Sequence, residues 1–362
     1  MTFLLFALHA GPISSATAQS PPEKPSVLEG FLRLFGRDRR EAMPAEPPPV
    51  VLGPRRVLII CGHPGDAERR ARFAETIETL NTALVERLGV QQEHVWLHFG
   101  VESMEEKGPT PAHSRGPATQ QAIGETLTEL KQTLKPEDAL WVIVMGHSFF
   151  NGRRSQFNLP GPDLDQEEFG RLFEGIACRE MVFWITIPAS GFYIRPLSAK
   201  GRIIITATEA DREINETEFP HALAETLANL PSEDSAGLRP PLASGPSTDP
   251  AQEAAVTDPP PMPSFDADAD GRPTLLDLYV AVCRNVMQRY ADENALPTEH
   301  ALLDDNGDGR GTELQIDYLP EELGGRGTSS PGSSPVSRSE TLDGAQAAAV
   351  VLSISPKPTP PE

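Results

Sequence analysis

The chain has 362 residues and a formal net charge of −21, with 52 acidic against 31 basic side chains. This surplus of negative charge argues against binding to nucleic acid, because a phosphate backbone is neutralised by basic residues. The 37 prolines and 29 glycines indicate that much of the chain lies outside any packed core, so we expect one folded domain with extended flanking segments.

The amino terminus has the pattern of a secretory signal peptide. Residues 1–8 are mostly apolar, and small residues then lead to an A-x-A type cleavage site that ends at Ala18. The sequence therefore predicts export to the periplasm or the exterior, with residues 1–18 as the signal peptide. Residues 19–54 are rich in proline, and we expect them to form a disordered arm. No later apolar run approaches the roughly twenty residues that span a bilayer, so no transmembrane span is expected.

Apolar runs that predict buried strands alternate with amphipathic segments that predict helices from residue 55 to residue 231. The strands are expected at 57–61, 94–98, 139–145, 181–187 and 202–208. The helices are expected at 67–88, 119–134, 164–176 and 219–230. This alternation predicts an α/β fold, a doubly wound and mostly parallel sheet with helices on both faces. The polar segment 146–163 is expected to be a loop.

The carboxyl-terminal part divides by composition into three segments. Residues 232–264 lack periodicity and predict a linker or a mobile insertion. Residues 265–321 form an extension in which two acidic loops flank an amphipathic helix at 275–290. Residues 322–362 are rich in glycine, serine, proline and alanine, so we expect a disordered tail apart from the apolar patch 347–354.

The topology predicts a site after the third and fourth predicted strands. His147 follows the strand 139–145, and the segment 188–191 follows the strand 181–187. A helix between two fully buried strands implies a parallel crossover, so both loops are expected at one edge of the sheet. In open α/β sheets the ligand binds outside the carboxyl ends of the strands, and we therefore expect the site there.

A buried strand that ends in Gly-His, followed one strand later by a loop of the form x-x-Ser-Gly, resembles the legumain and caspase group of cysteine peptidases. The similarity is closest to a bacterial legumain-like branch, through the segment 157–163 (FNLPGPD) and the Ile-Thr-Ala-Thr strand at 205–208. It covers about residues 56–230 and implies a caspase-like sheet, with the acidic loops as an extension. It also implies that His147 is the family's histidine and that Pro188 stands where the nucleophilic cysteine belongs.

Pro188 cannot perform the reaction of that family. Its side chain is no nucleophile, and its ring removes the backbone N–H that would donate to the oxyanion. The resemblance implies a second donor at Ser148, where the family has glycine, and a loop shaped by Ser190 and Gly191. Losing one oxyanion donor costs about 3 to 4 kcal/mol of transition-state stabilisation. The sequence therefore predicts an exported homologue without peptidase activity, a module that binds or scaffolds a peptide or protein ligand.

A working hydrolase with a displaced nucleophile is the first alternative. Cys61 or Ser190 would then act with His147. The resemblance puts the end of the first strand, with His63 and Asp66 in the turn that follows it, beside the primary specificity pocket. The competing interpretation is that Cys61 is a core thiol in an ordinary turn. All three cysteines of the chain lie in or beside apolar runs and do not form a disulfide framework.

The acidic loops support a second alternative, a calcium-binding envelope protein. The first loop has aspartates at positions one, three and five, glycine at six, a backbone carbonyl at seven and aspartate at twelve, which is the spacing of a calcium site. The expected ligands are Asp266, Asp268, Asp270, the carbonyl of Arg272, and Asp277. The second loop has Asp304, Asn306 and Asp308 but Gln315 at position twelve, and it fits less well. The competing interpretation is a solvated turn that caps a helix.

Overall fold

The computed structural model describes residues 52–100, 108–210, 213–230, 265–268, 270–326 and 342–355. All of them belong to one compact unit, Val51–Glu362. The predicted signal peptide, nearly all of the proline-rich arm and the predicted linker lie outside the described residues. None of the described helices is both long enough and apolar enough to cross a bilayer.

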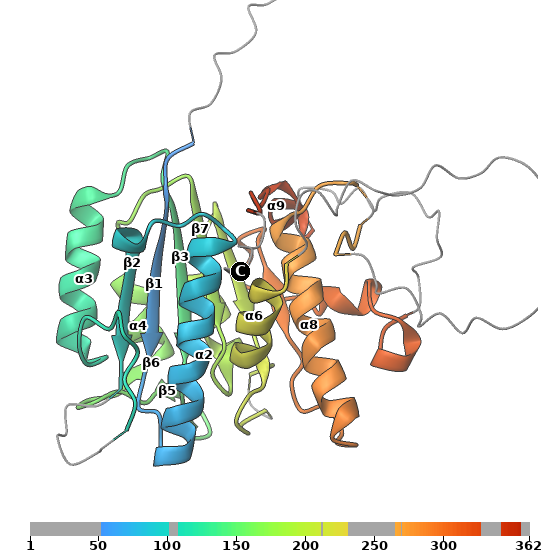
Figure 1. The fold of residues 1–362 in the computed structure, drawn as a ribbon, viewed down its shortest axis with the longest axis horizontal. Helices are drawn as coiled ribbons and strands as arrows, with labels where there is room; N and C mark the ends of the chain where they lie inside the picture. The colour runs from blue at the N-terminus through green and yellow to red at the C-terminus, as the bar shows by residue number, and fades with distance from the viewer. Residues whose placement is uncertain are drawn as a thin grey trace, which may run out of the picture. The chain divides into compact units, whose positions relative to one another are not determined.

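A six-stranded sheet with the order β2-β1-β3-β7-β8-β9 forms the centre of this unit (Figure 1). Its strands are β1 (Arg55–Cys61), β2 (Val95–Phe99), β3 (Ala139–Met145), β7 (Glu180–Ile185), β8 (Arg202–Thr206) and β9 (Leu302–Asp304). The first five pair in parallel, and β9 joins the edge in the antiparallel direction. The predicted α/β fold with a mostly parallel sheet is confirmed, whereas the edge strand β9 was not predicted.

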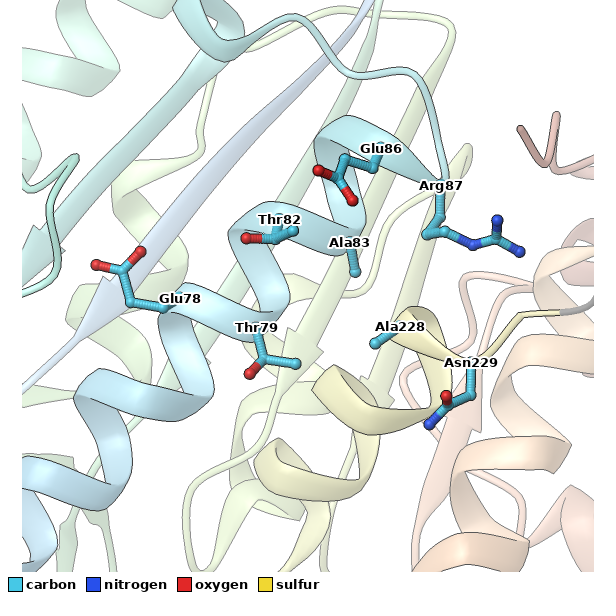
Figure 2. A pocket seen from close by; sticks show the side chains of 8 residues that line it. All are labelled: Glu78, Thr79, Thr82, Ala83, Glu86, Arg87, Ala228 and Asn229. Carbon is cyan, nitrogen blue, oxygen red and sulfur yellow. The ribbon is translucent and has the colours of Figure 1, made fainter. Parts of the chain in front are cut away.

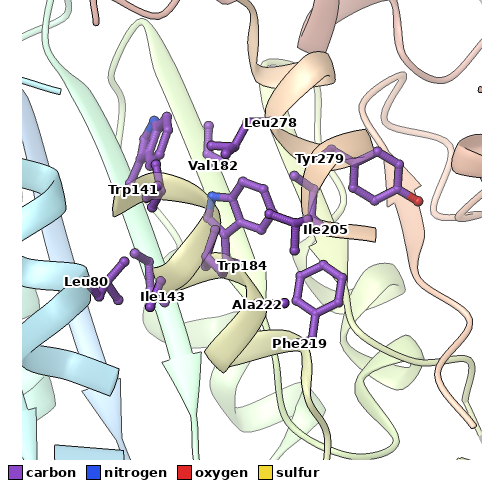
Figure 3. Close-up of a cluster of buried hydrophobic side chains, with 14 of the residues drawn as sticks. Leu80, Trp141, Ile143, Val182, Trp184, Ile205, Phe219, Ala222, Leu278 and Tyr279 are labelled. Carbon is purple, nitrogen blue, oxygen red and sulfur yellow. The ribbon is translucent and has the colours of Figure 1, made fainter. Parts of the chain in front are cut away.

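Helices cover both faces of the sheet, which is why the central strands are apolar beyond their first residues. One face carries α2 (Ala67–Glu86), α6 (Phe219–Ala228) and α8 (Leu275–Asp292), and the other carries α3 (Gln120–Thr133), α4 (Gln166–Leu172) and α5 (Ile194–Leu197). Successive residues of β1 alternate between the two cores, with Ile59 on the first face and Leu58 on the second. Figure 3 shows the first core, where Trp184 lies among residues of β8, α6 and α8.

Helices α2, α3 and α4 begin at residues whose side chains cap them. The side chains of Asp66 and Thr119 accept backbone N–H groups in the first turns of α2 and α3. Asp165 forms a reciprocal capping box with Glu168 at the start of α4. A capped start satisfies amide donors that have no partner within the helix. The predicted helix 164–176 is shorter in the structure: α4 begins at Gln166, after its cap, and ends at Leu172.

The segment 146–163, predicted to be a loop, contains two strands of a small antiparallel sheet, and this prediction is wrong. The sheet has the order β4-β5-β6 and consists of β4 (Ser148–Phe150), β5 (Ser155–Phe157) and β6 (Leu164–Asp165). Strands of two or three residues are too short to show a period of two in the sequence. The described residues also form four short 3₁₀ helices: Gln92–His94, Ser190–Tyr193, Leu314–Asp317 and Glu321–Leu323.

The carboxyl-terminal extension packs into the first core. The core includes residues of α8 and the 3₁₀ segment after β9, and also α9 (Ala345–Ala349) with the residues that follow it. The apolar patch 347–354, which was excepted from the predicted disordered tail, supplies Ala347, Leu352 and Ile354 to that core. Arg87 at the end of α2 holds this segment, since its guanidinium donates to the Ser355 carbonyl at 2.7 Å.

Replacement of Leu352 by alanine tests whether this patch is docked. Leu352 is 1% exposed, so Leu352→Ala removes packed methyl groups and should lower the free energy of unfolding by about 2 to 5 kcal/mol. Val351→Ala is the matched control, because Val351 is 42% exposed and its change should stay within about 0.5 kcal/mol. Urea unfolding followed by circular dichroism gives both values. Equal effects of the two substitutions would contradict the docking of this segment.

Candidate functional site

The two loops singled out from the sequence lie together at the carboxyl edge of the sheet, as predicted. β3 and β7 are adjacent and parallel, so residues 146–148 and 186–191 leave the sheet side by side. The hydroxyl of Ser148 donates a hydrogen bond of 2.6 Å to the carbonyl of Pro188. This bond joins the loop of the histidine to the loop in which the resemblance expects a nucleophile.

His147 makes its hydrogen bond away from that second loop. Its Nε2 lies 3.2 Å from the carbonyl of Pro64, and a carbonyl only accepts, so Nε2 carries the proton. The imidazole is half-buried and meets the ring of Phe73 edge-on, with 5.9 Å between the centroids. Glycine at position 65 lets this turn approach the imidazole of His147 closely, because its φ is +82° and a Cβ there would lie 2.8 Å from Nε2. The imidazole proton is therefore directed at the turn after β1.

Residues 188–190 are buried, and this loop is hydrogen-bonded to the segment that follows β8. Ala189 has a left-handed backbone with a φ of 49°, and its N–H donates to the Glu213 carbonyl at 2.8 Å. The amide of Ser190 donates to the Thr208 hydroxyl at 2.8 Å, and the two hydroxyl groups are 2.9 Å apart. The two backbone N–H groups that follow Pro188 therefore both have hydrogen-bond acceptors within the protein. The Ser190 hydroxyl fixes the loop, which is the role that the resemblance implies for it.

Gly191 completes the contact between this loop and the segment after β8. A Cβ on Gly191 would lie 2.7 Å from the amide nitrogen of Ala210, so only glycine fits without displacement of the backbone. The loop is held on one side by this approach and on the other by the Ser148 hydroxyl.

Cys61 is a core thiol at the end of β1. It is 0% exposed and belongs to the same core as Phe73 and Met145. Burial raises the pKa of the Cys61 thiol well above its ordinary value, and the nearby charge of Arg70 opposes this rise. A nucleophilic cysteine requires the opposite shift, because the reactive species is the thiolate.

His63 and Asp66, expected beside a specificity pocket, hold the turn between β1 and α2. The Nδ1 atom of His63 accepts the N–H of Gly65 at 3.1 Å, which leaves the proton of a neutral imidazole on Nε2. Asp66 caps α2 and forms an ion pair of 2.5 Å with Arg69, which in turn pairs with Glu216 at 2.6 Å. The bonds from Arg69 hold the pKa of Asp66 below its ordinary value.

Two hollows of the surface lie at the opposite edge. The larger, of about 390 Å³, lies between the carboxyl-terminal ends of α2 and α6 (Figure 2). Its lining is Glu78, Thr79, Thr82, Ala83, Glu86, Arg87, Ala228 and Asn229. The smaller, of about 160 Å³, lies at the amino ends of β7 and β8, next to α9. Neither hollow includes a residue that the sequence nominated for the site.

Strand β4, which sequence analysis missed, presents one free edge beside His147. The amide of Asn158 donates to the His147 carbonyl and that of Asn151 to the Arg154 carbonyl, which fixes the alternation of the hairpin. The N–H and C=O groups of Ser148 and Phe150 therefore point away from β5. No described strand pairs with β4 on that side.

The apolar side chain at the centre of β4 is exposed. Phe149 is 58% exposed, whereas Phe150 on the other face stacks on Phe192, with 5.1 Å between the ring centroids. An exposed aromatic side chain on an open strand edge is a feature of surfaces that bind extended chains.

The first acidic loop brings three of its predicted ligands together. Carboxylate oxygens of Asp266, Asp268 and Asp270 lie within 4.8 Å of one another. The two oxygens of Asp266 accept the amides of Asp270 and Gly271, at 3.1 and 2.9 Å. Burial raises the pKa of Asp268, and the charge of Asp270 raises it further. The three carboxylates are thus close enough to share one metal ion.

Asp277, the predicted closing ligand, is not part of this cluster. It forms a capping box with Thr274 at the start of α8 and also accepts the amide of Ala267 at 2.7 Å. Burial raises the pKa of Asp277 to about 6. At the predicted carbonyl ligand Arg272, the amide donates to Asp270 at 2.7 Å. The structure thus brings three aspartates together and uses the fourth as a helix cap.

Comparison of the sequence with family models gives no match, and comparison with curated proteins gives none at a significant level.

The stability of the core beneath the His147 loop is expected to depend on pH through His221. It lies on α6, is 6% exposed, and stacks on Phe73 with 5.6 Å between the centroids. Its Nδ1 lies 2.6 Å from the hydroxyl of Thr76. Burial lowers the pKa of His221 from 6.5 to about 4, with a further contribution from the charge of Arg72.

A comparison of the wild type with His221→Asn isolates this effect. Because the pKa of His221 is lower in the folded chain, its contribution is present above pH 6.5 and is lost as the pH falls towards 4. The shift corresponds to about 3 kcal/mol, so the wild type should lose up to that much more free energy of unfolding than the variant between pH 7 and pH 4. Urea unfolding at several pH values measures the difference. The carboxyl groups with raised pKa change the free energy of unfolding in the opposite direction, but by the same amount in both proteins. Parallel plots of this free energy against pH for the two proteins would contradict the prediction.

Proposed function

We propose that the chain is an exported homologue of the legumain and caspase group that has no peptidase activity and binds an extended peptide segment at the carboxyl edge of its sheet. The relationship is supported by the resemblance at 146–148 and 188–191. Export is supported by the mostly apolar residues 1–8 and the small residues that follow them up to Ala18. The observation that carries the proposal is the bond from the Ser148 hydroxyl to the Pro188 carbonyl.

The absence of peptidase activity is supported by how the side chains at this edge are used. Pro188 has neither a nucleophile nor an amide donor. Of the alternative nucleophiles, Cys61 is fully buried with a raised pKa, and the Ser190 hydroxyl is bonded to Thr208. The imidazole of His147 donates to Pro64 and makes no hydrogen bond to a hydroxyl or a thiol among the described residues. Covalent catalysis requires a nucleophile within hydrogen-bond reach of its base.

Binding is supported by the open edge of β4. An extended segment can add to a free edge through its own amide and carbonyl groups, and an exposed side chain on the strand then contributes apolar contact. Phe149 offers that contact next to the His147 loop. The net charge of −21 favours a basic segment over an acidic one.

A peptide library tests both parts of this proposal. The full chain is incubated with the library, and mass spectrometry should find no cleavage above that of the His147→Ala variant. Fluorescence polarisation with labelled peptides should find binding that Phe149→Ala weakens at least tenfold, because burying a phenylalanine contributes about 1.5 to 3 kcal/mol. Leu342→Ala is the control, since Leu342 is similarly exposed at 55%, lies just before α9, and should leave the affinity unchanged.

Two results would contradict the proposal. One is cleavage that is lost in His147→Ala, or in Cys61→Ser together with covalent labelling of the Cys61 thiol by a peptide probe. The other is an affinity that falls equally in Phe149→Ala and Leu342→Ala, because the contact would then not be at β4.

Calcium binding at the first acidic loop is the second candidate function. The favouring observation is the convergence of Asp266, Asp268 and Asp270 within 4.8 Å. Carboxylate oxygens at this spacing match the preference of calcium for hard oxygen ligands. The capping box of Asp277 links the loop directly to α8, so an ion there would also stabilise the start of that helix.

The count of bound calcium ions tests this site. Calorimetric titration of Asp268→Asn should show one equivalent fewer than the wild type, because a ligand has lost its charge. Asp292→Asn removes an equal charge from the end of α8 and should leave the count unchanged. An identical count in the wild type and in Asp268→Asn would exclude a site at this loop.

A further inference from the structure

Glu213 joins three segments of the chain next to the loop 188–191. Its backbone carbonyl accepts the amide of Ala189 at 2.8 Å, and its carboxylate oxygen Oε2 accepts the amides of Glu209 and His300 at 2.8 and 2.9 Å. Its other carboxylate oxygen accepts a hydrogen bond from Nδ1 of His300. Glu213 is only 7% exposed, so its carboxylate depends on partners within the protein rather than on water.

The far end of the segment 213–217 is bonded on the same two sides. The hydroxyl of Thr217 donates to the carbonyl of Thr186 at 2.5 Å, directly after β7. Glu299, which lies with His300 in the extension between α8 and β9, accepts the amides of the two residues that follow Thr217, at 2.7 and 3.1 Å. The segment is therefore held at both of its ends between the candidate site and the carboxyl-terminal extension.

The charges around His300 make one of these bonds depend on pH. The charged groups that face its imidazole are Glu213 and Glu209, from the segment after β8, and Glu313, from the segment after β9. Burial opposes the charged form of the imidazole. The hydrogen bond and the charge of Glu213, together with the charges of the other two glutamates, outweigh burial and raise the pKa of His300 above its ordinary value of 6.5.

We propose that Glu213 and His300 form a pH-dependent clamp, by which the carboxyl-terminal extension holds the segment 213–217 against the loop 188–191. A carboxylate only accepts, so Nδ1 of His300 donates to it whether the ring is neutral or charged. Protonation of Nε2 adds the attraction of opposite charges and strengthens this bond. Because the pKa of His300 is raised in the folded chain, the added strength is complete below pH 6.5 and is lost as the pH rises through the raised pKa.

Hydrogen exchange of the full chain, measured by NMR at pH 6 and pH 9 and corrected for intrinsic exchange rates, tests the clamp. The reporters are the amides of Ala189 and Glu209, which both donate to Glu213. The informative variant is His300→Asn, because asparagine keeps a donor near the position of Nδ1 but carries no charge. At pH 6 the wild type should protect both amides about two- to fivefold more than the variant, a modest factor because the His300 side chain is 45% exposed. At pH 9 the two proteins should agree.

Two further measurements separate His300 from other titrating groups. His113→Asn removes an exposed imidazole between β2 and α3, and this variant should match the wild type at both pH values. Burial raises the pKa of Glu299 to about 7, but Glu299 is present in all three proteins and its effect cancels in the comparison. The NMR titration of the His300 ring should have its midpoint above 6.5.

Three results would overturn the proposal. The first is equal protection of the reporter amides in the wild type and His300→Asn at pH 6. The second is a difference that stays the same at pH 9, because the effect would then not come from the charge. The third is a midpoint for His300 at or below 6.5. No peptide is used in these measurements, so they can fail or succeed independently of the proposed peptide binding.

Discussion

The hydrogen bond from the Ser148 hydroxyl to the Pro188 carbonyl joins the two loops on which the functional interpretation depends. The parallel pairing of β3 and β7 brings these loops to the same edge. Proline at 188 has no amide to present there, and its carbonyl is taken by a side chain from the neighbouring loop. The free edge of β4 lies beside these joined loops. On this arrangement we base the proposal that the chain binds an extended segment and does not cleave it.

The main sheet could be predicted because its strands are buried on both faces. Each of β1, β3 and β7 sits between two layers of helices, so the side chains are apolar along each strand except at its start, where β1 has Arg55 and Arg56 and β7 has Glu180. The strands β4, β5, β6 and β9 could not be predicted, since each has two or three residues and owes its pairing to partners elsewhere in the chain. Leu352 lies in an apolar patch that the sequence does single out, but its place in the core depends on distant residues such as Pro273, whose carbonyl accepts the amide of Leu352 at 2.8 Å.

For the candidate site, the order of strands and helices predicted the edge of the sheet at which it lies, but not the hydrogen-bond partners of its residues. The sequence places His147 at a strand end, but no residue near it in the sequence indicates that the carbonyl of Pro64 accepts its hydrogen bond. Ser190 is paired with Thr208 through the adjacency of β7 and β8. For Asp277 a local signal did exist: a threonine three residues before an acidic residue and an apolar run is the signature of a capping box. That spacing coincides with the end of a calcium loop, and the cap is the role the structure gives it.

The distribution of charge connects the acidic loops to the proposed export. Folding buries Asp277, Asp304 and Asp305 near other carboxylates, and burial raises the pKa of each of them. Such groups are stabilised by protonation or by cations, and loops with incomplete ligand sets bind calcium weakly, in the range of about 10⁻⁴ to 10⁻³ M that is typical of extracellular modules. A weak site is filled only where calcium is abundant, which is outside the cell. The export expected from residues 1–18 and the calcium site proposed for the first acidic loop therefore require the same environment, although they rest on separate parts of the chain.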